Sequence, residues 1–314
     1  MELFIQVSSL LRMCGIAGLY IKSAALQVNL GELLSRMIVE LSDRGPDSAG
    51  VAFYRDPTSP GSCRVSLHSQ SAVDWHAVRA DLEAEFGAAS PPEVRATHAT
   101  LVVDGEAEEV QAWLDERHPE VTVMSSGRAI EIYKQAGAPR QFVERFALHE
   151  IAGSHALGHT RMATESRVTT AHSHPFSTGL DLCLVHNGSL SNHNRVRKDL
   201  QREGIVFRTL NDSEVAAGYL MWRMREGATL DQALEGCLED LDGFYTFAVG
   251  TADGFAVLRD PIACKPAVLA ETDEWVAMAS EYRAIATLPG AEEARIWEPE
   301  PATVYSWERE GVAA

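Results

Sequence analysis

The hexapeptide Met13-Cys14-Gly15-Ile16-Ala17-Gly18 places a cysteine between a methionine and a run of small and apolar residues. Residues 15–20 predict a buried strand, so Cys14 stands where that strand begins. If Met13 is the first residue made and is then removed, Cys14 carries a free α-amino group. Such an amine, with a pKa of about 7.7–8, is suited to take the proton of its own thiol. The alternative for this segment alone is a buried structural cysteine.

The composition is that of a globular chain, with 46% hydrophobic and 23% charged residues among 314. The net charge of −18 argues against a surface for nucleic acid or for an anionic membrane. No apolar run reaches the roughly 18 residues that span a bilayer, and residues 1–12 lack the features of a signal peptide. Five cysteines without a CxxC pair exclude a dense disulfide framework, so we expect reduced thiols in the cytoplasm.

The hydrophobic pattern predicts strands at both ends of the chain around central helices. Helices are expected over residues 30–41, 75–86, 106–117, 127–146, 214–225 and 230–241, and strands over 15–20, 50–54, 97–103, 121–124, 244–250, 255–259, 267–270 and 275–279. This order favours a layered α+β architecture with mostly antiparallel sheets. Residues from about 64 to 150 have a β-α-β pattern of their own, which predicts a small α/β insert in a larger domain.

Five polar motifs follow the cysteine, and those after residue 155 form a stretch rich in His, Asn, Ser, Thr and Gly. They are Leu41-Ser42-Asp43-Arg44-Gly45-Pro46-Asp47-Ser48-Ala49-Gly50, Gly158-His159-Thr160-Arg161-Met162-Ala163-Thr164, His172-Ser173-His174-Pro175-Phe176, Val185-His186-Asn187-Gly188-Ser189-Leu190-Ser191-Asn192 and Asn211-Asp212-Ser213-Glu214-Val215. Such a composition is typical of a site built on loops. The ordered series resembles the class II glutamine amidotransferase domain over nearly all of residues 14–285. The resemblance implies a four-layer αββα N-terminal-nucleophile hydrolase fold.

The resemblance also implies a chemistry for Cys14. Its thiolate would attack the γ-amide carbon of glutamine, which gives a thioester and ammonia, and water would then release glutamate. The Asn187 side chain and the Gly188 backbone N–H match the donors that stabilise the oxyanion of the tetrahedral intermediate. Glycine at position 188 also lets the backbone approach the substrate closely.

Further residues match the family's substrate-binding positions. Arg161 matches the cation that binds the α-carboxylate of glutamine, and Asp212 matches the carboxylate that binds its α-ammonium. Thr164 and His174 match positions that line the glutamine pocket. Arg44, in an Arg-Gly-Pro-Asp turn, matches a supporting residue beside the nucleophile.

Each of these residues also has a structural interpretation when it is taken alone. Arg161 could be a surface arginine, Asp212 a helix N-cap, and Asn187-Gly188 a hairpin turn. Their joint occurrence with Met13-Cys14-Gly15 favours the active site. The pair His172 and His174 could suggest a metal, but no third ligand stands at a sensible spacing, so no metal is expected.

Two features depart from the family pattern. Residues 1–13 precede the nucleophile, and we expect them to be a misassigned start or a leader that is removed. Residues 14–314 are expected to form one amidotransferase domain with no synthase domain, so ammonia-accepting glutamate-synthase-like partner subunits are expected. Segments 129–134, 158–166 and 259–266 resemble stand-alone subunits of that kind, including the first subunit of N-methylglutamate synthase. In that system the flavin and iron–sulfur sites belong to other subunits, so this chain is expected to hold no cofactor.

Two other functions remain open at this point. One is a catalytically idle amidotransferase-like subunit that binds or regulates a partner. The other is a self-contained amide hydrolase with a different substrate. The intact set of Cys14, Arg161, Asn187, Gly188 and Asp212 speaks against an idle copy, and the two amino-acid anchors favour glutamine.

Overall fold

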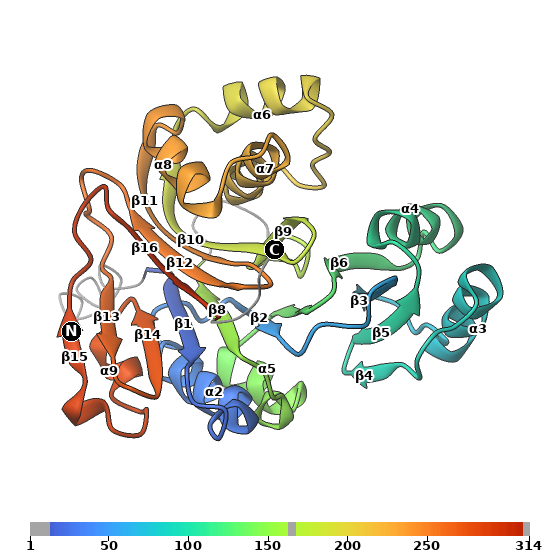
Figure 1. Cartoon of the computed structure of the whole chain (residues 1–314), viewed down its shortest axis with the longest axis horizontal. Coiled ribbons are helices and arrows are strands. Elements are labelled where there is room, and N and C mark those ends of the chain that lie inside the picture. Colours follow the sequence, from blue (N-terminus) through green and yellow to red (C-terminus); the bar gives the residue numbers. More distant parts are fainter. Residues whose placement is uncertain (1–12, 163–167, 310–314) are drawn as a thin grey trace, which may run out of the picture.

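Two antiparallel sheets are stacked face to face, and helices cover both outer faces (Figure 1). The computed structural model describes residues 13–162 and 168–309. The layers follow the order helix, sheet, sheet, helix, which is the predicted αββα arrangement. In the part of the chain that is described, no helix is long and apolar enough to cross a membrane.

The first sheet has seven strands, and all of its neighbours are antiparallel. Its order is β15 (Arg295–Trp297), β13 (Val268–Glu271), β14 (Trp275–Ala279), β1 (Gly15–Ile21), β8 (His155–Arg161), β2 (Ser48–Tyr54) and β7 (Ile130–Ala136). The outer face of this sheet is covered by α2 (Leu30–Glu40), α5 (Pro139–Arg145) and α9 (Tyr282–Ile285). Short 3₁₀ turns lie at Gln27–Asn29, Leu148–Glu150 and Ala291–Glu293.

The second sheet has five antiparallel strands. Its order is β16 (Val304–Glu308), β12 (Gly254–Arg259), β11 (Gly243–Gly250), β10 (Leu182–Leu190) and β9 (Phe176–Gly179). Three helices form the layer above it: α6 (His193–Arg202), α7 (Asp212–Arg225) and α8 (Leu230–Asp240). A capping box formed by Thr229 and Gln232 starts α8.

Alternation along β1 explains why the sequence shows an unbroken apolar run. Ala17, Leu19 and Ile21 pack toward α2, whereas Ile16 and Tyr20 belong to the core between the two sheets. Both faces of the strand are therefore buried, and neither face needs polar residues. Burial on both faces fixes the start of the strand, which directly follows Cys14.

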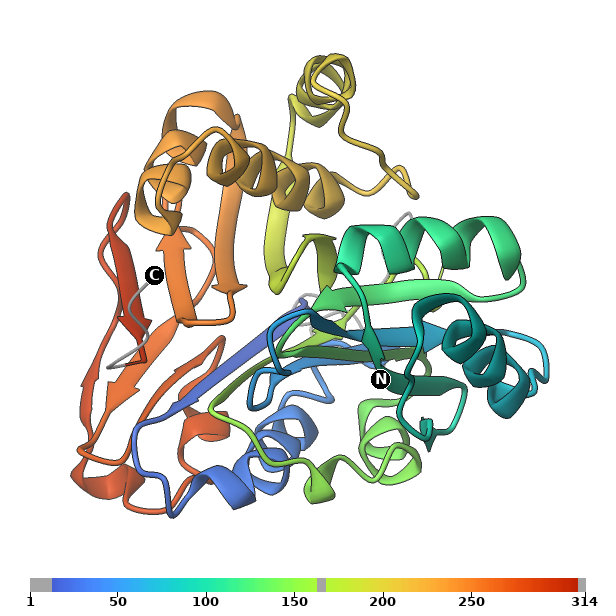
Figure 2. The same cartoon turned by 45° about the vertical axis from the view of Figure 1, so that its right-hand side comes forward.

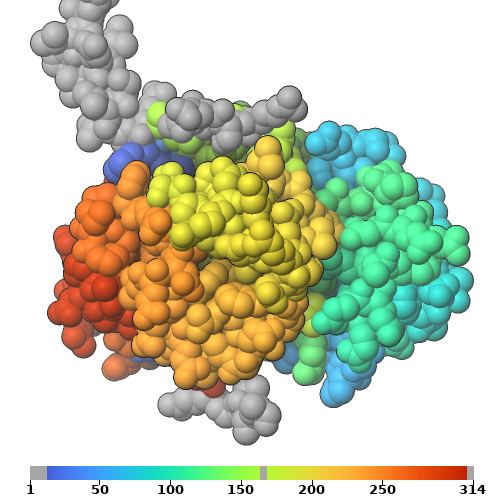
Figure 3. All heavy atoms as spheres, turned by 90° about the horizontal axis from the view of Figure 1, so that it is seen from above, coloured from blue at the N-terminus to red at the C-terminus, as the bar shows by residue number. Residues whose placement is uncertain are grey.

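A third sheet forms a separate lobe at one side of the molecule (Figures 2 and 3). Its strands are β4 (Glu93–Arg95), β5 (His98–Asp104), β3 (Ser62–His68) and β6 (Thr122–Gly127), and α3 (Trp75–Phe86) and α4 (Ala107–Arg117) pack on it. The lobe has its own hydrophobic core, built around residues such as Leu82, Leu101 and Val110.

The structure divides the stretch in which we expected the insert. Residues 62–127 form the lobe, whereas β7 joins the first sheet and α5 packs beside α2. The helix predicted over residues 127–146 is wrong, because residues 130–136 form β7 and a helix begins only at Pro139. Ile130 and Ile132 alternate with polar residues as in a strand, and proline is favoured at the start of a helix.

Candidate active site

Cys14 lies at the entrance to β1, half-buried, and its backbone is held from two sides. The carbonyl oxygen of Cys14 accepts a hydrogen bond of 3.1 Å from Arg44 Nε and another of 3.1 Å from Asn187 Nδ2. The thiol points to the end of β8, where Sγ lies 3.9 Å from the carbonyl oxygen of Met162. Three segments that are distant in sequence therefore meet at this cysteine.

Arg44 reaches Cys14 from the tight turn that follows α2. Arg44 is buried, and its Nη1 donates to Glu281 Oε1 at 2.5 Å, just before α9. The turn packs closely against the end of β8: a Cβ at Gly45 would lie 2.3 Å from the carbonyl carbon of Thr160. The backbone N–H of Asp47 donates to the carbonyl oxygen of Arg161. The Arg-Gly-Pro-Asp motif thus has a packing reason for its glycine.

The Cys14 thiol has opposing influences on its ionisation. Burial raises the pKa of the Cys14 thiol above its ordinary value. The hydrogen bond to Met162 and the positive charges of Arg161, Lys265 and Arg44 each lower that pKa, but burial prevails. Arg161 ends β8 and is itself 5% exposed, so it is no surface arginine.

Asn187 and Gly188 lie together on β10, opposite Thr246 and Tyr245 of β11. Asn187 is buried, and Gly188 has a φ of +149°. A Cβ at Gly188 would lie 2.0 Å from the carbonyl oxygen of Phe244, so only glycine fits. This pair continues a strand pairing and is not a hairpin turn.

Asp212 is the first residue of α7 and is tied to the end of β10. Its Oδ2 accepts a hydrogen bond of 2.9 Å from the backbone N–H of Leu190. The N-cap of the helix is Asn211, whose side chain accepts from the Ser213 N–H at 2.8 Å. The N-cap of α7 is therefore Asn211, and the N-cap interpretation of Asp212 is wrong.

His174 lies in a buried group of side chains that includes His159 and Ser213. Its ring stacks on that of His159 with centroids 4.0 Å apart, and its Nε2 lies 2.8 Å from Ser213 Oγ. Lys134 of β7 holds the loop on either side, donating to the carbonyl oxygens of Ser173 at 3.0 Å and Pro175 at 3.2 Å. Burial lowers the pKa of His174 well below its ordinary value, so the ring is neutral.

The structure therefore brings Cys14, Arg44 and Asn187 into direct contact, with Arg161 beside them. Thr164 lies outside the described residues. Among the described residues, no group of three or more His, Cys, Asp or Glu side chains is arranged to hold a metal ion. His172 Nδ1 lies 2.8 Å from Thr169 Oγ1 instead.

Sequence reasoning missed several residues at this site. Lys265 affects the thiol and lies with its Nζ 3.9 Å from Met13 Sδ, and Glu281 pairs with Arg44. Nothing in the local sequence marks Glu281, because its role depends on a partner 237 residues away. His159, His186 and Ser213 lie within the polar motifs, so their place in a motif was the feature that could have marked them as site residues.

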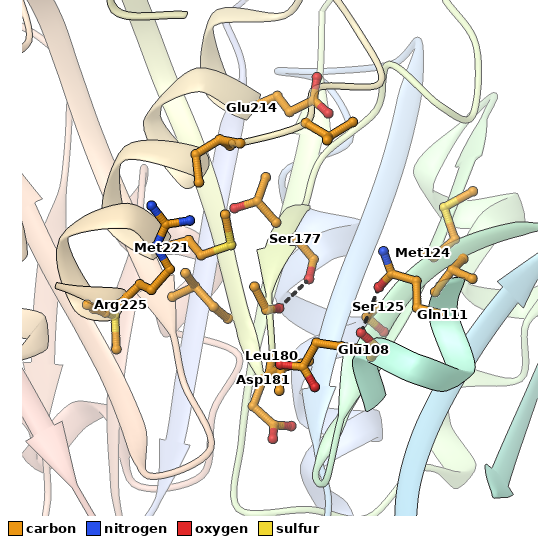
Figure 4. Close-up of a pocket in the computed structure, with 18 of the residues that line it drawn as sticks. Glu108, Gln111, Met124, Ser125, Ser177, Leu180, Asp181, Glu214, Met221 and Arg225 are labelled. Atoms are coloured by element: carbon orange, nitrogen blue, oxygen red, sulfur yellow. Dashed lines mark hydrogen bonds between the residues drawn. The ribbon is translucent and has the colours of Figure 1, made fainter. Parts of the chain in front are cut away.

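A separate cavity of about 770 Å³ lies between the lobe and the body (Figure 4). Gln111 and Ser125 line it from the lobe, and Met221 and Arg225 line it from α7. Cys14, Arg161, Asn187 and Asp212 are not among its lining residues. The thiol therefore faces a different place in the molecule.

Comparison with known proteins identifies the family. A model described as a glutamine amidotransferase domain matches residues 159–287. The glutamine amidotransferase-like protein GlxB of Rhizobium meliloti (strain 1021) is 54% identical over 303 residues, which cover 96% of this chain and 100% of that protein. This chain belongs to the glutamine amidotransferase family. An amidophosphoribosyltransferase of Archaeoglobus fulgidus is 34% identical over 143 residues, 45% of this chain and 31% of that protein.

A solved structure shows the same fold. The glutamine phosphoribosylpyrophosphate amidotransferase from B. subtilis, complexed with ADP and GMP, superposes with a TM-score of 0.60 at 20% sequence identity. The match covers 95% of this glutamine amidotransferase family member and 48% of that chain, so this chain spans about half of that structure. The likeness confirms the predicted N-terminal-nucleophile hydrolase fold.

Proposed function

We propose that this amidotransferase hydrolyses the side-chain amide of glutamine through Cys14 and releases glutamate and ammonia. The observation that carries the proposal is the convergence on Cys14 of Arg44, Asn187 and the end of β8. Family membership supports glutamine as the substrate. The cationic side chains beside the thiol support a role as nucleophile, because each of them favours the thiolate.

The proposed reaction has two steps. In the first, Cys14 Sγ bonds to the γ-carbon, and the Asn187 side chain and the Gly188 N–H stabilise the oxyanion. An amide side chain has two N–H donors, so Asn187 retains one while the other bonds to the Cys14 carbonyl. The carbon–nitrogen bond then breaks, and the leaving nitrogen takes the proton of the thiol to form ammonia. In the second step, water cleaves the thioester, which releases glutamate and restores the thiol.

The thiol needs a base, since burial raises the pKa of Cys14. We propose that Met13 and the residues before it are absent from the working enzyme, so that the α-amine of Cys14 takes the proton. An α-amine has a pKa of about 7.7–8 and therefore titrates near neutral pH. Loss of Met13 would also release Lys265 Nζ from the Met13 thioether beside the nucleophile.

The remaining substrate contacts are proposed from the family pattern. Arg161 binds the α-carboxylate of glutamine and Asp212 its α-ammonium, while Thr164 and His174 shape the pocket. The burial of Arg161 and its charge beside the Cys14 thiol support the first role. The bond of Asp212 to Leu190, two residues after Gly188 on β10, supports the second.

We further propose that the ammonia passes to a glutamate-synthase-like partner subunit, in N-methylglutamate or glutamate synthesis. The three segments that resemble stand-alone subunits of this kind support the assignment. All five cysteines lie in the described ranges and none forms a disulfide, which supports a place in the reducing cytoplasm. Transfer of ¹⁵N from the amide of labelled glutamine to a product, in the presence of co-purified partners, tests this part.

The nucleophile is tested by labelling with 6-diazo-5-oxo-L-norleucine, an electrophilic analogue of glutamine. The full chain and a form that starts at Met13 are compared, and the mass of each N-terminus is measured. We expect an adduct on Cys14 and glutamate release only where Cys14 is the first residue. Cys14→Ala abolishes both, whereas Cys264→Ala, at an exposed cysteine, changes neither. A form with a verified Cys14 terminus that neither reacts nor releases glutamate, even with partners, would establish an idle binding subunit instead.

A further inference from the structure

Four buried polar side chains form a connected group next to residues of the proposed site: His159, His174, His186 and Ser213, here called the histidine–serine cluster. Their exposed fractions are 1%, 6%, 3% and 1%. Ser213 Oγ is the hub of the group, because it lies 2.8 Å from both His174 Nε2 and His186 Nδ1. It also lies 3.4 Å from Asp212 Oδ1.

Donor and acceptor counts assign one arrangement of protons to the cluster. A serine hydroxyl donates one hydrogen bond and accepts two. Because the Asp212 carboxylate only accepts, Ser213 satisfies all three contacts by donating to Asp212 and accepting from both rings. His174 then carries its proton on Nε2 and His186 on Nδ1. His159 carries its proton on Nε2, since that atom faces the carbonyl oxygen of His186 at 3.0 Å.

The second nitrogen of each ring has no hydrogen-bond partner among the described residues. These atoms are His159 Nδ1, His174 Nδ1 and His186 Nε2. In the assigned tautomers all three are unprotonated, so no buried N–H is left without an acceptor. A Cβ at Gly188 would lie 2.8 Å from His186 Nε2, which places this lone pair against the backbone of the oxyanion donor.

The cluster connects three different layers of the fold at the positions where they present site residues. His159 precedes Arg161 by two residues on β8, in the first sheet. His186 directly precedes Asn187 on β10, in the second sheet. Ser213 directly follows Asp212 at the start of α7, in the outer helical layer. The His159–His186 and His186–Ser213 bonds therefore tie together the backbones that carry Arg161, Asn187 and Asp212.

We propose that the histidine–serine cluster is a positioning network, with Ser213 as its hub, that sets the spacing between the carboxylate, oxyanion and ammonium sites for glutamine. The inference rests on the proposed function and adds the residues that hold its binding groups in register. Glutamine bridges these three sites when it binds, so an error in their spacing weakens its binding and misplaces its amide. Of its members, only His174 is also proposed to shape the pocket; His159, His186 and Ser213 act through the residues that they position.

Ser213→Ala tests the hub, because it leaves two buried ring N–H groups without an acceptor. We expect KM for glutamine to rise about tenfold and kcat/KM to fall about 100-fold, since each step of about 1.4 kcal/mol is a factor of ten. Alkylation of Cys14 by iodoacetamide, which uses none of the three sites, should change less than about twofold. Ser213→Thr keeps the hydroxyl and should restore most of the activity.

Ser154→Ala is the matched control. Ser154 is also buried and its Oγ lies 2.9 Å from His155 Nδ1, at the opposite end of β8 from Arg161. It removes the same kind of bond and should leave KM unchanged. Unchanged KM and kcat in Ser213→Ala, or equal losses in Ser213→Ala and Ser154→Ala, would overturn the proposal.

Two measurements do not depend on turnover. Calorimetry of glutamine binding to Cys14→Ala, with and without Ser213→Ala, should show about tenfold weaker binding in the double variant. ¹⁵N NMR of the ring nitrogens of the unsubstituted protein should show Nε2–H for His159 and His174 and Nδ1–H for His186; any other set overturns the network. Failure of the proposed function has a different signature, namely no Cys14 adduct and no glutamate from the unsubstituted enzyme.

Discussion

Asn187 Nδ2 donates a hydrogen bond of 3.1 Å to the carbonyl oxygen of Cys14 across 173 residues of sequence. The bond joins β10 of the second sheet to the start of β1 in the first, so the position of the cysteine depends on how the two sheets stack. Arg44 donates to the same oxygen from the turn between α2 and β2. The backbone of the proposed nucleophile is thus held by both halves of the fold.

Asn187→Asp replaces this donor with a carboxylate of the same shape. The carboxylate oxygen would face the Cys14 carbonyl and repel it, and the proposed oxyanion donor would be lost. We expect glutamate release to fall at least about 100-fold and the free energy of unfolding to fall by about 2 kcal/mol. Glutaminase assays and urea unfolding measure the two effects. Asn192→Asp, at a partly buried asparagine that bonds to the Asp240 carbonyl away from Cys14, should leave activity intact.

The pair of Arg44 and Glu281 predicts an acid-sensitive contribution to stability. Partial burial raises the pKa of Glu281, but the hydrogen bond and charge of Arg44, with Arg283, outweigh it and lower the pKa below its ordinary value of 4.5. Because the folded pKa is depressed, the contribution is complete above pH 4.5 and is lost as the pH falls through the folded value. Urea midpoints measured from pH 6 to 3 should decline less steeply in Glu281→Gln. Arg44→Gln should flatten the decline in the same way, and the double variant should add little to either.

Gly188→Ala should disrupt the strand pairing around the oxyanion donor. A Cβ there meets the Phe244 carbonyl at 2.0 Å, and the positive φ adds strain. We expect a loss of about 3 kcal/mol or more, or failure to fold. Gly204→Ala is the matched control, since φ is +84° but no atom lies within 4 Å of its Cβ, and it should cost about 1 kcal/mol. Similar losses in both variants would show that backbone strain, not the contact, decides.

Buried neutral histidines should make the protein less stable as the pH falls below neutrality. Burial lowers the pKa values of His155 and His159 from 6.5 to about 3. Their contribution is complete above about pH 6.5 and declines as the pH falls toward 3, because only the unfolded chain takes up the protons. Each histidine should lower the free energy of unfolding by about 1.4 kcal/mol per pH unit between pH 6 and 4. Denaturant titrations of His155→Gln should show a decline that is less steep by about 1.4 kcal/mol per pH unit. An unchanged slope would contradict the lowered pKa of His155.

Asp181 should prove important for holding the lobe against the body. Its carboxylate, in the β9–β10 turn, accepts backbone N–H groups from Arg128, Ala129 and Ile130 at 2.7, 2.7 and 3.0 Å. Asp181→Ala leaves three donors without this acceptor and should cost about 3 kcal/mol. Faster hydrogen exchange in residues 128–130, measured by mass spectrometry, should accompany the loss. Asp181 and Asp253 both line the cavity between the lobe and the body. As a control, Asp253→Ala should cost less than about 0.5 kcal/mol.

The hydrophobic pattern predicted a layered α+β fold, and the family resemblance implied the αββα order and the chemistry of the site. Apolar runs and helical periodicity placed β1, α2 and several later elements, because strands buried on both faces and amphipathic helices leave a local pattern. They did not place β8 and β10, which carry the polar motifs. The polar motifs marked Cys14, Arg161, Asn187 and Asp212 as candidates. The single helix predicted over residues 127–146 is wrong, since a short strand followed by a helix resembles one longer periodic segment. Pro139, at the first position of α5, was the residue that marked where the helix begins.

Only the tertiary structure decided how the candidates meet. Glu281 beside Arg44, Lys265 beside Met13 and the bonds of Ser213 to two histidines join residues from separate sheets and helices. Such contacts leave no local pattern, because their geometry depends on how two sheets stack and where a helix begins. The sequence by itself determined which groups are present and which elements carry them. The packing of the layers determined which of those groups share hydrogen bonds and how deeply each is buried.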